Sequence, residues 1–271
     1  MEFAHVSVLL QESLDGLRIR PDGIYVDGTA GGAGHSREIA KRLTTGRLIT
    51  FDQDPDAVKT AAERLAPYPQ AEVVHDNFRN MASRLEERQA LPVDGVLLDL
   101  GVSSWQLDNP ERGFSYREDA PLDMRMSKEG ETAAELLARS SESEIARILW
   151  EYGEERYSRQ IARKIVEKRE KEPVLTTFQL ADLIKSAMPA AARREKNPCK
   201  RSFQALRIAV NSELDALSNG IDAAFDCLSE GGRLCIITFH SLEDRMVKQK
   251  FLDLARGCVC PPEFPVCVCG R

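Results

Sequence analysis

Short apolar runs alternate with longer amphipathic stretches over the first hundred residues of the chain. The apolar runs predict β-strands at 24–26, 47–51, 72–75 and 95–100. Two of the stretches between them predict helices, at 36–43 and at 55–65. Strands that alternate with helices and are themselves mostly apolar are typical of a parallel sheet with both faces covered. The pattern therefore predicts an α/β domain.

This rhythm stops near residue 103 and returns only close to residue 233. The residues between 105 and 130 read as loop, and helical spacing without a convincing strand then predicts helices at 133–137, 142–152, 157–169, 178–188 and 203–217. A strand of the first kind follows two glycines, at 233–239. We therefore expect a helical insert within the α/β domain, dividing the chain into 1–104, 105–215 and 216–271.

Composition narrows the class of protein. The 271 residues are 42% hydrophobic and 30% charged, which excludes a disordered or low-complexity chain. The chain contains no apolar run of about 18 residues, and its first residues lack the basic start and apolar stretch of a secretory signal. We expect a cytoplasmic protein without a membrane span. The formal charge of −6 taken alone argues against a nucleic-acid partner.

The distribution of charge reverses that argument. Residues 156–207 hold 14 basic and five acidic side chains, a net charge of +9, so the remaining residues together carry −15. Helix surfaces often carry Lys and Arg, but glutamates usually balance them one turn away. A basic segment beside an acidic one favours a polyanion such as RNA as partner. The candidate RNA contacts are Arg193, Arg194, Lys196, Lys200, Arg201 and Arg207.

Four of the seven cysteines crowd the end of the chain. They are Cys258, Cys260, Cys267 and Cys269. Without a signal peptide a disulfide framework is not expected, whereas four thiols in a proline-turned loop have the ligand number of a tetrahedral zinc site. Structural zinc sites usually separate paired cysteines by two residues or more, so the C-x-C spacing fits zinc less well. Zinc and four reduced thiols both remain open.

Three features at successive strand ends predict a bound nucleoside. A glycine-rich turn, DGTAGGAG at 27–34, follows the first strand, Asp52 ends the second, and Asp99 ends the fourth. The glycine spacing is neither the dinucleotide fingerprint nor a P-loop. A carboxylate at the position of Asp52 can accept hydrogen bonds from both ribose hydroxyls of a nucleoside. S-adenosylmethionine fits this arrangement better than NAD, although a plain tight turn and helix caps would use the same residue types.

Several long segments resemble one known family. They are HVSVLLQE at 5–12, DGTAGGAGHS at 27–36, FDQDP at 51–55, LLDLGVSSWQLD at 97–108, ERGFSY at 111–116, PLDMRM at 121–126, YGEER at 152–156, SFQALRIAVNSEL at 202–214 and GGRLCIITFHSLEDR at 231–245. In order and over nearly the whole chain, these segments resemble the MraW family of ribosomal RNA small subunit methyltransferases.

The resemblance implies both a fold and a reaction. It implies a class I, Rossmann-like, S-adenosylmethionine-dependent methyltransferase with an inserted helical domain, methylating N4 of a cytidine in the decoding region of 16S rRNA. The implied partner is 16S rRNA or the small ribosomal subunit. The cofactor-binding positions carried over from the family are Ala33, Gly34, His35, Asp52, Phe78, Asp99 and Gln106.

The resemblance also directs attention to the catalytic group. Because the N4 amine of cytosine is conjugated with its ring, an acceptor for one of its hydrogens favours the pyramidal nitrogen that can attack a methyl carbon. Many amino-methyltransferases use an Asp/Asn-Pro-Pro-Tyr segment after the fourth strand, and here the segment begins DLGVSSW. Asp99 is our hypothesis for the acceptor. His240 and Ser241 are further candidates for holding a flipped base, although a His that ends a strand is often structural.

The chain departs from the family pattern in two places. Asn197-Pro198 stands where the family has His-Pro, so no role is carried over to that histidine. Family members continue beyond residue 271, and we expect the late antiparallel strand of the class I sheet to be affected. The competing readings are an amino-methyltransferase acting on another RNA or on DNA, a nucleotide-binding oxidoreductase, which the glycine spacing disfavours, and a non-catalytic RNA-binding relative.

Overall fold

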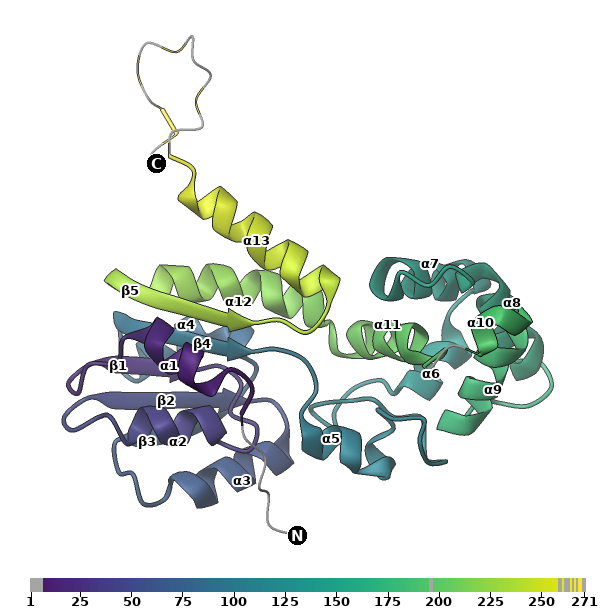
Figure 1. The fold of residues 1–271 in the computed structure, drawn as a ribbon, viewed down its shortest axis with the longest axis horizontal. Helices are drawn as coiled ribbons and strands as arrows, with labels where there is room; N and C mark the ends of the chain where they lie inside the picture. The colour runs from purple at the N-terminus through teal and green to yellow at the C-terminus, as the bar shows by residue number, and fades with distance from the viewer. Residues whose placement is uncertain are drawn as a thin grey trace.

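A sheet of five parallel strands forms the centre of the larger lobe (Figure 1). The computed structural model describes residues 7–194 and 197–257, together with Cys260, Phe264, Val266, Val268 and Cys269. The strands lie in the order β3-β2-β1-β4-β5. Their bounds are β1 Ile24–Asp27, β2 Arg47–Asp52, β3 Ala71–His75, β4 Val93–Asp99 and β5 Leu228–Ile237.

Two hydrophobic clusters cover the two faces of this sheet. One face packs against α1 (Leu10–Leu17), α2 (Gly34–Ala40) and α3 (Pro55–Leu65), and the other against α4 (Met81–Glu87), α12 (Glu213–Cys227) and α13 (Ser241–Ala255). The central strands are buried on both faces, which explains why their sequences are nearly continuous apolar runs. The prediction of an α/β domain with a parallel sheet is confirmed.

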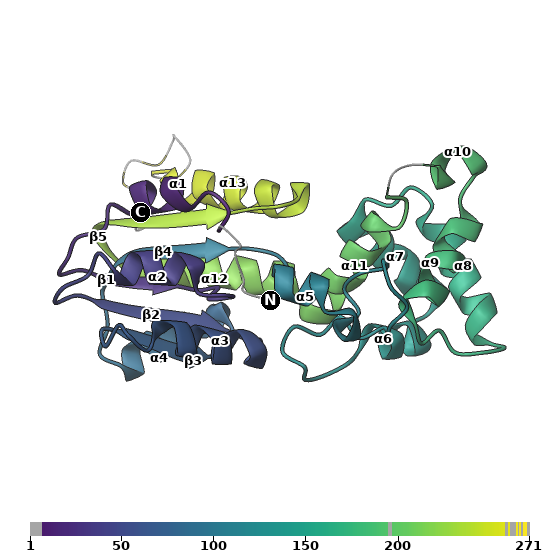
Figure 2. The same cartoon turned by 60° about the horizontal axis from the view of Figure 1, so that its bottom comes forward.

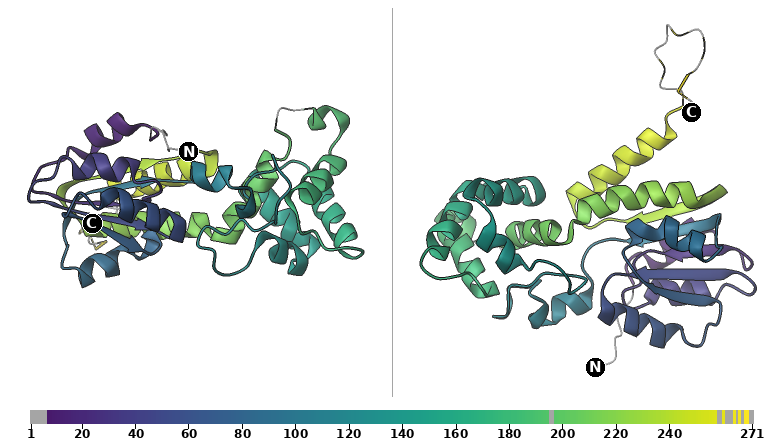
Figure 3. Two further views of the ribbon diagram at one scale, coloured as in Figure 1. Left: turned by 90° about the horizontal axis from the view of Figure 1, so that it is seen from below. Right: turned by 180° about the vertical axis from the view of Figure 1, so that it is seen from behind.

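The helices of the insert form a second lobe with a core of its own (Figures 2 and 3). Its helices enclose a third cluster in which Met124, Ile145, Ile161, Ile184 and Leu206 are each fully buried. The bounds are α5 Ser104–Asp108, η2 Pro110–Arg112, α6 Ala133–Arg139, α7 Glu142–Gly153, α8 Ser158–Arg169, α9 Thr177–Ala187, α10 Ala190–Arg193 and α11 Lys200–Asn211. The hydrophobic core of this lobe is separate from the two clusters on the sheet.

The expectation of one helix over 203–217 is wrong. The chain breaks at Ser212, whose φ of 48° is left-handed, so α11 ends at Asn211 and α12 begins at Glu213. The apolar face of α11 packs into the core of the insert, whereas that of α12 packs on the sheet. The two helices therefore take different directions, and amphipathic spacing alone does not reveal the change.

The last strand also begins earlier than its apolar run indicates. β5 starts at Leu228 and includes Gly231 and Gly232, expected as a turn before the strand. Val93 pairs with Leu228 but Gly95 pairs with Arg233, so the extra residues of β5 form an irregularity within the ladder. Beyond it the register is regular, and Asp99 at the end of β4 pairs with Ile237.

Candidate active site

The glycine-rich turn lies at the carboxyl edge of the sheet, directly after β1. Asp27 holds its base, since one carboxylate oxygen accepts the Thr29 N–H at 3.1 Å and the other accepts the Ser36 hydroxyl at 2.6 Å. Ser36 Oγ also lies 3.1 Å from Thr50 Oγ1 and can accept the threonine hydroxyl hydrogen, and the side chains of Asp27, Ser36 and Thr50 are all buried. The sequence analysis did not select Ser36 or Thr50. The feature that could have indicated them is a polar residue in an otherwise apolar, buried position beside the turn.

Neighbouring side chains lie so close to the turn at two of its glycines that any added side chain would displace them. A Cβ on Gly28 would lie 2.4 Å from the side chain of Leu98, and one on Gly34 would lie 1.9 Å from the hydroxyl of Ser7. Ala33 precedes α2 in the left-handed region, with φ of 58°. The turn is therefore a cradle closed on one side by the segment that begins at Ser7.

Asp52 ends β2 with its carboxylate held by two backbone groups. One oxygen accepts the Gly31 N–H at 2.8 Å, and the other accepts the Asp54 N–H at 2.9 Å. Burial raises the pKa of Asp52 to about 6. Each oxygen keeps acceptor capacity beyond these bonds, as two ribose hydroxyls require.

Phe78 follows β3 at the same edge, in η1 (Phe78–Asn80), and lies against a glycine of α12. A Cβ on Gly220 would lie 2.4 Å from two atoms of the Phe78 ring, so only glycine lets the ring take this position. The ring is partly buried. The residues after β1, β2 and β3 thus gather on adjacent strands, as expected for one ligand lying across them.

Gln106 belongs to a buried polar cluster beside Asp54. Its side-chain oxygen accepts the Ser103 N–H at 3.0 Å, and its amide nitrogen donates to Asp54 Oδ2 at 2.7 Å. The side chain is only 5% exposed. One amide hydrogen is left for a ligand after these bonds.

Arg112 completes this cluster and was missed by the sequence analysis. Its guanidinium lies 2.8 Å from Asp54 and donates to the carbonyls of Arg125 and Met126, each at 2.9 Å. It therefore ties the loops of the insert to the end of β2. Arg112 lies in the ERGFSY segment and the two carbonyls lie in the PLDMRM segment, but the sequence of neither segment indicates that they are hydrogen-bonded to each other.

Asp99 ends β4 with its Oδ1 buried and its Oδ2 facing His35. Its N–H donates to Thr29 Oγ1 at 2.7 Å, and its Oδ2 lies 3.6 Å from His35 Nδ1. Among the described residues the buried Oδ1 has no hydrogen-bond partner. Burial raises the pKa of Asp99 to about 6, His35 opposes the rise, and Asp27 and Glu243 add to it.

His35 connects Asp99 to the first described residues. Its Nε2 lies 3.0 Å from the Val8 carbonyl, which only accepts, so Nε2 carries the hydrogen of that bond. Nδ1 then faces Asp99. Of the cofactor positions expected from the family, Ala33, Gly34, His35, Asp52, Phe78 and Asp99 follow β1–β4 at this edge, and Gln106 lies behind it on Asp54.

His240 and Ser241 are engaged in capping and in a contact between the lobes. His240 caps α13 by accepting the Glu243 N–H at 3.4 Å, and its Nε2 lies 3.2 Å from the Glu243 carboxylate. Ser241 donates to Glu154, at the end of α7, at 3.1 Å. Burial alone would raise the pKa of Glu243, but hydrogen bonds from His240 and the Phe239 N–H, with the charge of Arg207, hold that pKa below its ordinary value.

The candidate RNA contacts fall into two groups. Arg193, Arg194, Lys200 and Arg201 are exposed around α10 and the start of α11. Arg207 has a side chain only 14% exposed and forms a two-point ion pair with Glu213, at 2.8 and 2.9 Å, across the break at Ser212. Lys196 lies outside the described residues.

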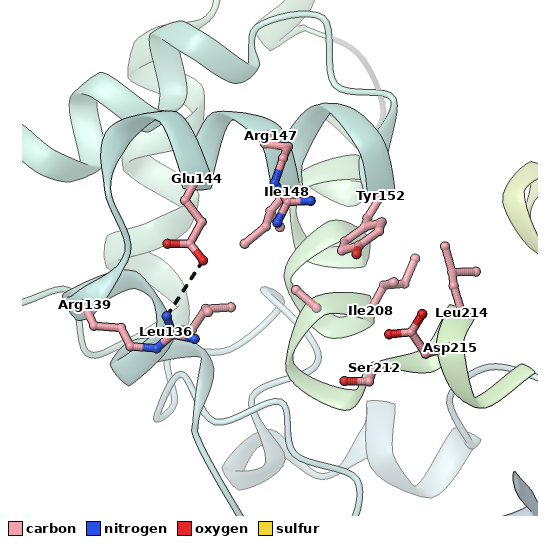
Figure 4. Close-up of a pocket in the computed structure, with 11 residues that line it drawn as sticks. Leu136, Arg139, Glu144, Arg147, Ile148, Tyr152, Ile208, Ser212, Leu214 and Asp215 are labelled. Atoms are coloured by element: carbon pink, nitrogen blue, oxygen red, sulfur yellow. Dashed lines mark ion pairs between the residues drawn. The ribbon is translucent and has the colours of Figure 1, made fainter. Parts of the chain in front are cut away.

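A pocket of about 150 Å³ opens where the helices of the insert meet the start of α12 (Figure 4). Side chains of α6, α7, α11 and α12 line it, including Arg139, Arg147, Tyr152 and Asp215. Arg139 and Glu144 form an ion pair of 3.8 Å at its rim. None of the family-derived cofactor positions lines this pocket.

Neither a metal cluster nor a membrane-spanning helix is found in the part of the chain that the structure describes. No group of three or more His, Cys, Asp or Glu side chains there is arranged to hold a metal ion. Cys258 and Cys267 of the zinc hypothesis lie outside that part, so the hypothesis stays a prediction. No described helix is long and apolar enough to cross a bilayer.

The parallel sheet, the glycine cradle and the carboxylates at successive strand ends are the arrangement expected of an α/β enzyme that binds a nucleoside cofactor. The chain belongs to the MraW methylase family, whose model matches residues 2–271, and it is a methyltransferase. Curated proteins named ribosomal RNA small subunit methyltransferase H from Clostridium botulinum (strain Kyoto / Type A2) and from Heliobacterium mobile are each 54% identical to it. Both alignments cover 100% of this chain and 88% of the relative.

Similarity to solved structures is much weaker. An rRNA methylase from Streptococcus thermophilus matches 36% of this chain and 58% of its own at 21% identity, with a TM-score of 0.31. The family assignment therefore depends on sequence.

Proposed function

We propose that this methylase transfers the methyl group of S-adenosylmethionine to N4 of a cytidine in the decoding region of 16S rRNA, as free RNA or within the small ribosomal subunit. The names of its 54% identical relatives support the rRNA substrate. The observation that carries the chemistry is the carboxylate of Asp99 at the carboxyl edge of the sheet, which is 25% exposed and has one oxygen without a hydrogen-bond partner among the described residues.

The residues of the cofactor half fit S-adenosylmethionine. Asp52 would accept both ribose hydroxyls, because its oxygens each hold one backbone N–H and retain acceptor capacity. Phe78 would lie beside the adenine, and the glycine cradle would wrap the methionine end. The bound cofactor supplies an electrophilic methyl carbon.

Asp99 would act on the amine of the base. As a carboxylate it would accept a hydrogen bond from the N4 amine, which favours the pyramidal nitrogen and directs its lone pair toward the methyl carbon, and it would take up the proton that the nitrogen loses when the N–CH₃ bond forms. Burial matters here because a desolvated acceptor interacts more strongly than one in water. The Asp99 side chain is 25% exposed, which leaves its carboxylate accessible to a substrate amine.

The helical insert, 105–215, would recognise the RNA. The net charge of +9 over residues 156–207 supports a polyanion partner, and the exposed arginines and lysine around α10 and α11 are its expected phosphate contacts. Arg207 is expected instead to set the junction between the lobes, because its charge is already paired with Glu213.

The test is methyl transfer from labelled S-adenosylmethionine to 16S rRNA, presented free and within 30S particles and followed by nucleoside analysis. The proposal expects N4-methylcytidine on at least one of the two substrates. Label in another nucleoside, or only in DNA, would favour an amino-methyltransferase of different specificity. Binding of RNA without label in any substrate would indicate a non-catalytic relative.

A further inference from the structure

An aromatic side chain stands unexplained at the carboxyl end of β5. Phe239 directly follows the strand and precedes the cap of α13, yet it is 54% exposed. Single exposed hydrophobic residues are common, so exposure alone means little. Phe239 lies two residues beyond Ile237, which pairs with Asp99 in the sheet. Its exposure matters because of this position.

A structural role in helix capping does not account for the ring. A hydrophobic residue before an N-cap commonly packs on the fourth residue of the helix. With His240 as N-cap of α13, that fourth residue is Asp244, whose charge pairs with Lys248 at 2.9 Å. Phe239 therefore has no apolar partner of the usual kind.

The ring lies instead against the backbone that follows Asp99. Asp99 pairs with Ile237, and the Leu100 N–H donates to the Ile237 carbonyl at 3.1 Å, so the two strand ends run on side by side. A Cβ built on Gly101, which has φ of 94°, would lie 3.5 Å from the Phe239 ring.

A hydrogen bond to Glu243 holds the backbone of Phe239 in place. Its N–H donates to the buried carboxylate of Glu243 at 2.8 Å, which also faces the imidazole of His240. The ring is thus an exposed surface on an anchored strand end, which is what a stacking platform requires.

The strand order divides the edge between two ligands. Most of the family-derived cofactor positions follow β1, β2 and β3, Asp99 follows β4, and Phe239 follows β5 at the edge of the sheet beyond β4. Residues 100–104 after Asp99 contain no aromatic side chain. An extruded base is usually read between stacking side chains and hydrogen-bond acceptors, and aromatic stacking contributes strongly to holding single-stranded nucleic acid.

We propose that Phe239 is the platform on which the methyl-accepting cytosine stacks, with its amine directed to the carboxylate of Asp99. The proposal rests on the function proposed above and names a substrate-binding residue for it. In this arrangement β5 supplies the aromatic ring and β4 supplies the acceptor.

The test compares Phe239→Leu, which keeps apolar bulk but removes the π-face, with Phe239→Tyr and Phe239→Trp, which keep it. Methyl transfer to the substrate accepted by the wild type gives kcat and KM, and S-adenosylmethionine binding is measured separately by calorimetry. We expect kcat/KM to fall about 10- to 100-fold in Phe239→Leu, with cofactor affinity unchanged and most of the loss restored in the aromatic variants. Phe225→Leu is the matched control, because Phe225 is 48% exposed but lies before β5, at the opposite end of the strand.

Three results would overturn the platform. They are a kcat/KM of Phe239→Leu within twofold of the wild type, an equal loss in the two aromatic variants, or a parallel loss of cofactor affinity. A wild type that methylates no RNA would refute the proposed function itself, whereas an active wild type with an unaffected Phe239→Leu would refute only the platform.

Discussion

The carboxyl edge of the sheet has two halves of opposite character. Over β1, β2 and β3 the carboxylates are satisfied, since Asp27 accepts from Thr29 and Ser36, and Asp52 accepts from two backbone N–H groups. Over β4 and β5 the polar and aromatic groups are left incomplete, with one oxygen of Asp99 unpartnered within the described structure and the Phe239 ring exposed.

This difference indicates which half of the carboxyl edge is already formed before a ligand binds. A buried polar atom without a partner costs about 1–3 kcal/mol, so such atoms are retained where a ligand completes them. The carboxylates of the first half are held by hydrogen bonds without any ligand. The second half is completed by the substrate amine and base, which would concentrate the stabilisation at the reacting atoms.

Replacing Asp99 should have the largest effect on turnover. Asp99→Ala should lower kcat about 10²- to 10⁴-fold, because the acceptor that shapes the amine is lost. Calorimetry should give S-adenosylmethionine affinity within a few-fold of the wild type. Normal turnover of Asp99→Ala would remove this residue from the catalytic role and erase the contrast between the halves.

Replacing the satisfied carboxylate should act on binding. Asp52→Ala removes two charge-assisted acceptors for the ribose, so cofactor affinity should fall on the order of 100-fold while kcat at saturating cofactor stays within a few-fold. Titration calorimetry and cofactor-saturated kinetics separate the two effects. A variant that binds normally but turns over slowly would assign Asp52 to the chemistry instead.

The two carboxylates should also differ in their contribution to stability. The pKa of Asp99 is about 6 in the folded chain against about 3.9 for an ordinary Asp, so above pH 6 folding buries a charge at a cost. Asp99→Asn should therefore raise the free energy of unfolding by about 1–2 kcal/mol near pH 8. That gain should shrink as the pH falls through 6 and vanish below about pH 4, where both states of the wild type are protonated.

Asp52→Asn is the matched comparison, followed by urea denaturation across the same pH range. The pKa of Asp52 is also about 6, but its two oxygens accept backbone N–H groups that an amide can satisfy only in part. It should not gain stability at pH 8. Equal gains in both variants would show that burial outweighs hydrogen bonding in both halves.

The smallest effect is expected outside both halves, on the basic surface of the insert. Arg193→Ala combined with Arg194→Ala should weaken binding of the RNA substrate a few-fold and lower the slope of log affinity against log salt by about one or two. Cofactor affinity should not change. A salt slope equal to that of the wild type would place the RNA backbone elsewhere.

Much of this molecule was determined by its sequence. Apolar runs alternating with helical spacing indicated the parallel sheet, and the loss of strands after residue 103 indicated the insert, because side-chain burial imposes these periods locally. The family segments indicated the methylase family, which the family match confirms, and the cofactor positions that they indicated follow adjacent strand ends.

Tertiary structure alone decided how groups distant in sequence meet. The break at Ser212 arises because α11 and α12 pack on different cores, and the pairing of Arg207 with Glu213 follows from that break. The ion pair of Asp54 and Arg112 joins the two lobes. Whether an oxygen of Asp99 has a hydrogen-bond partner depends on the groups that the fold brings around it. Hydrogen-bond satisfaction and ring exposure depend on three-dimensional neighbours, so neither can be read from spacing along the chain.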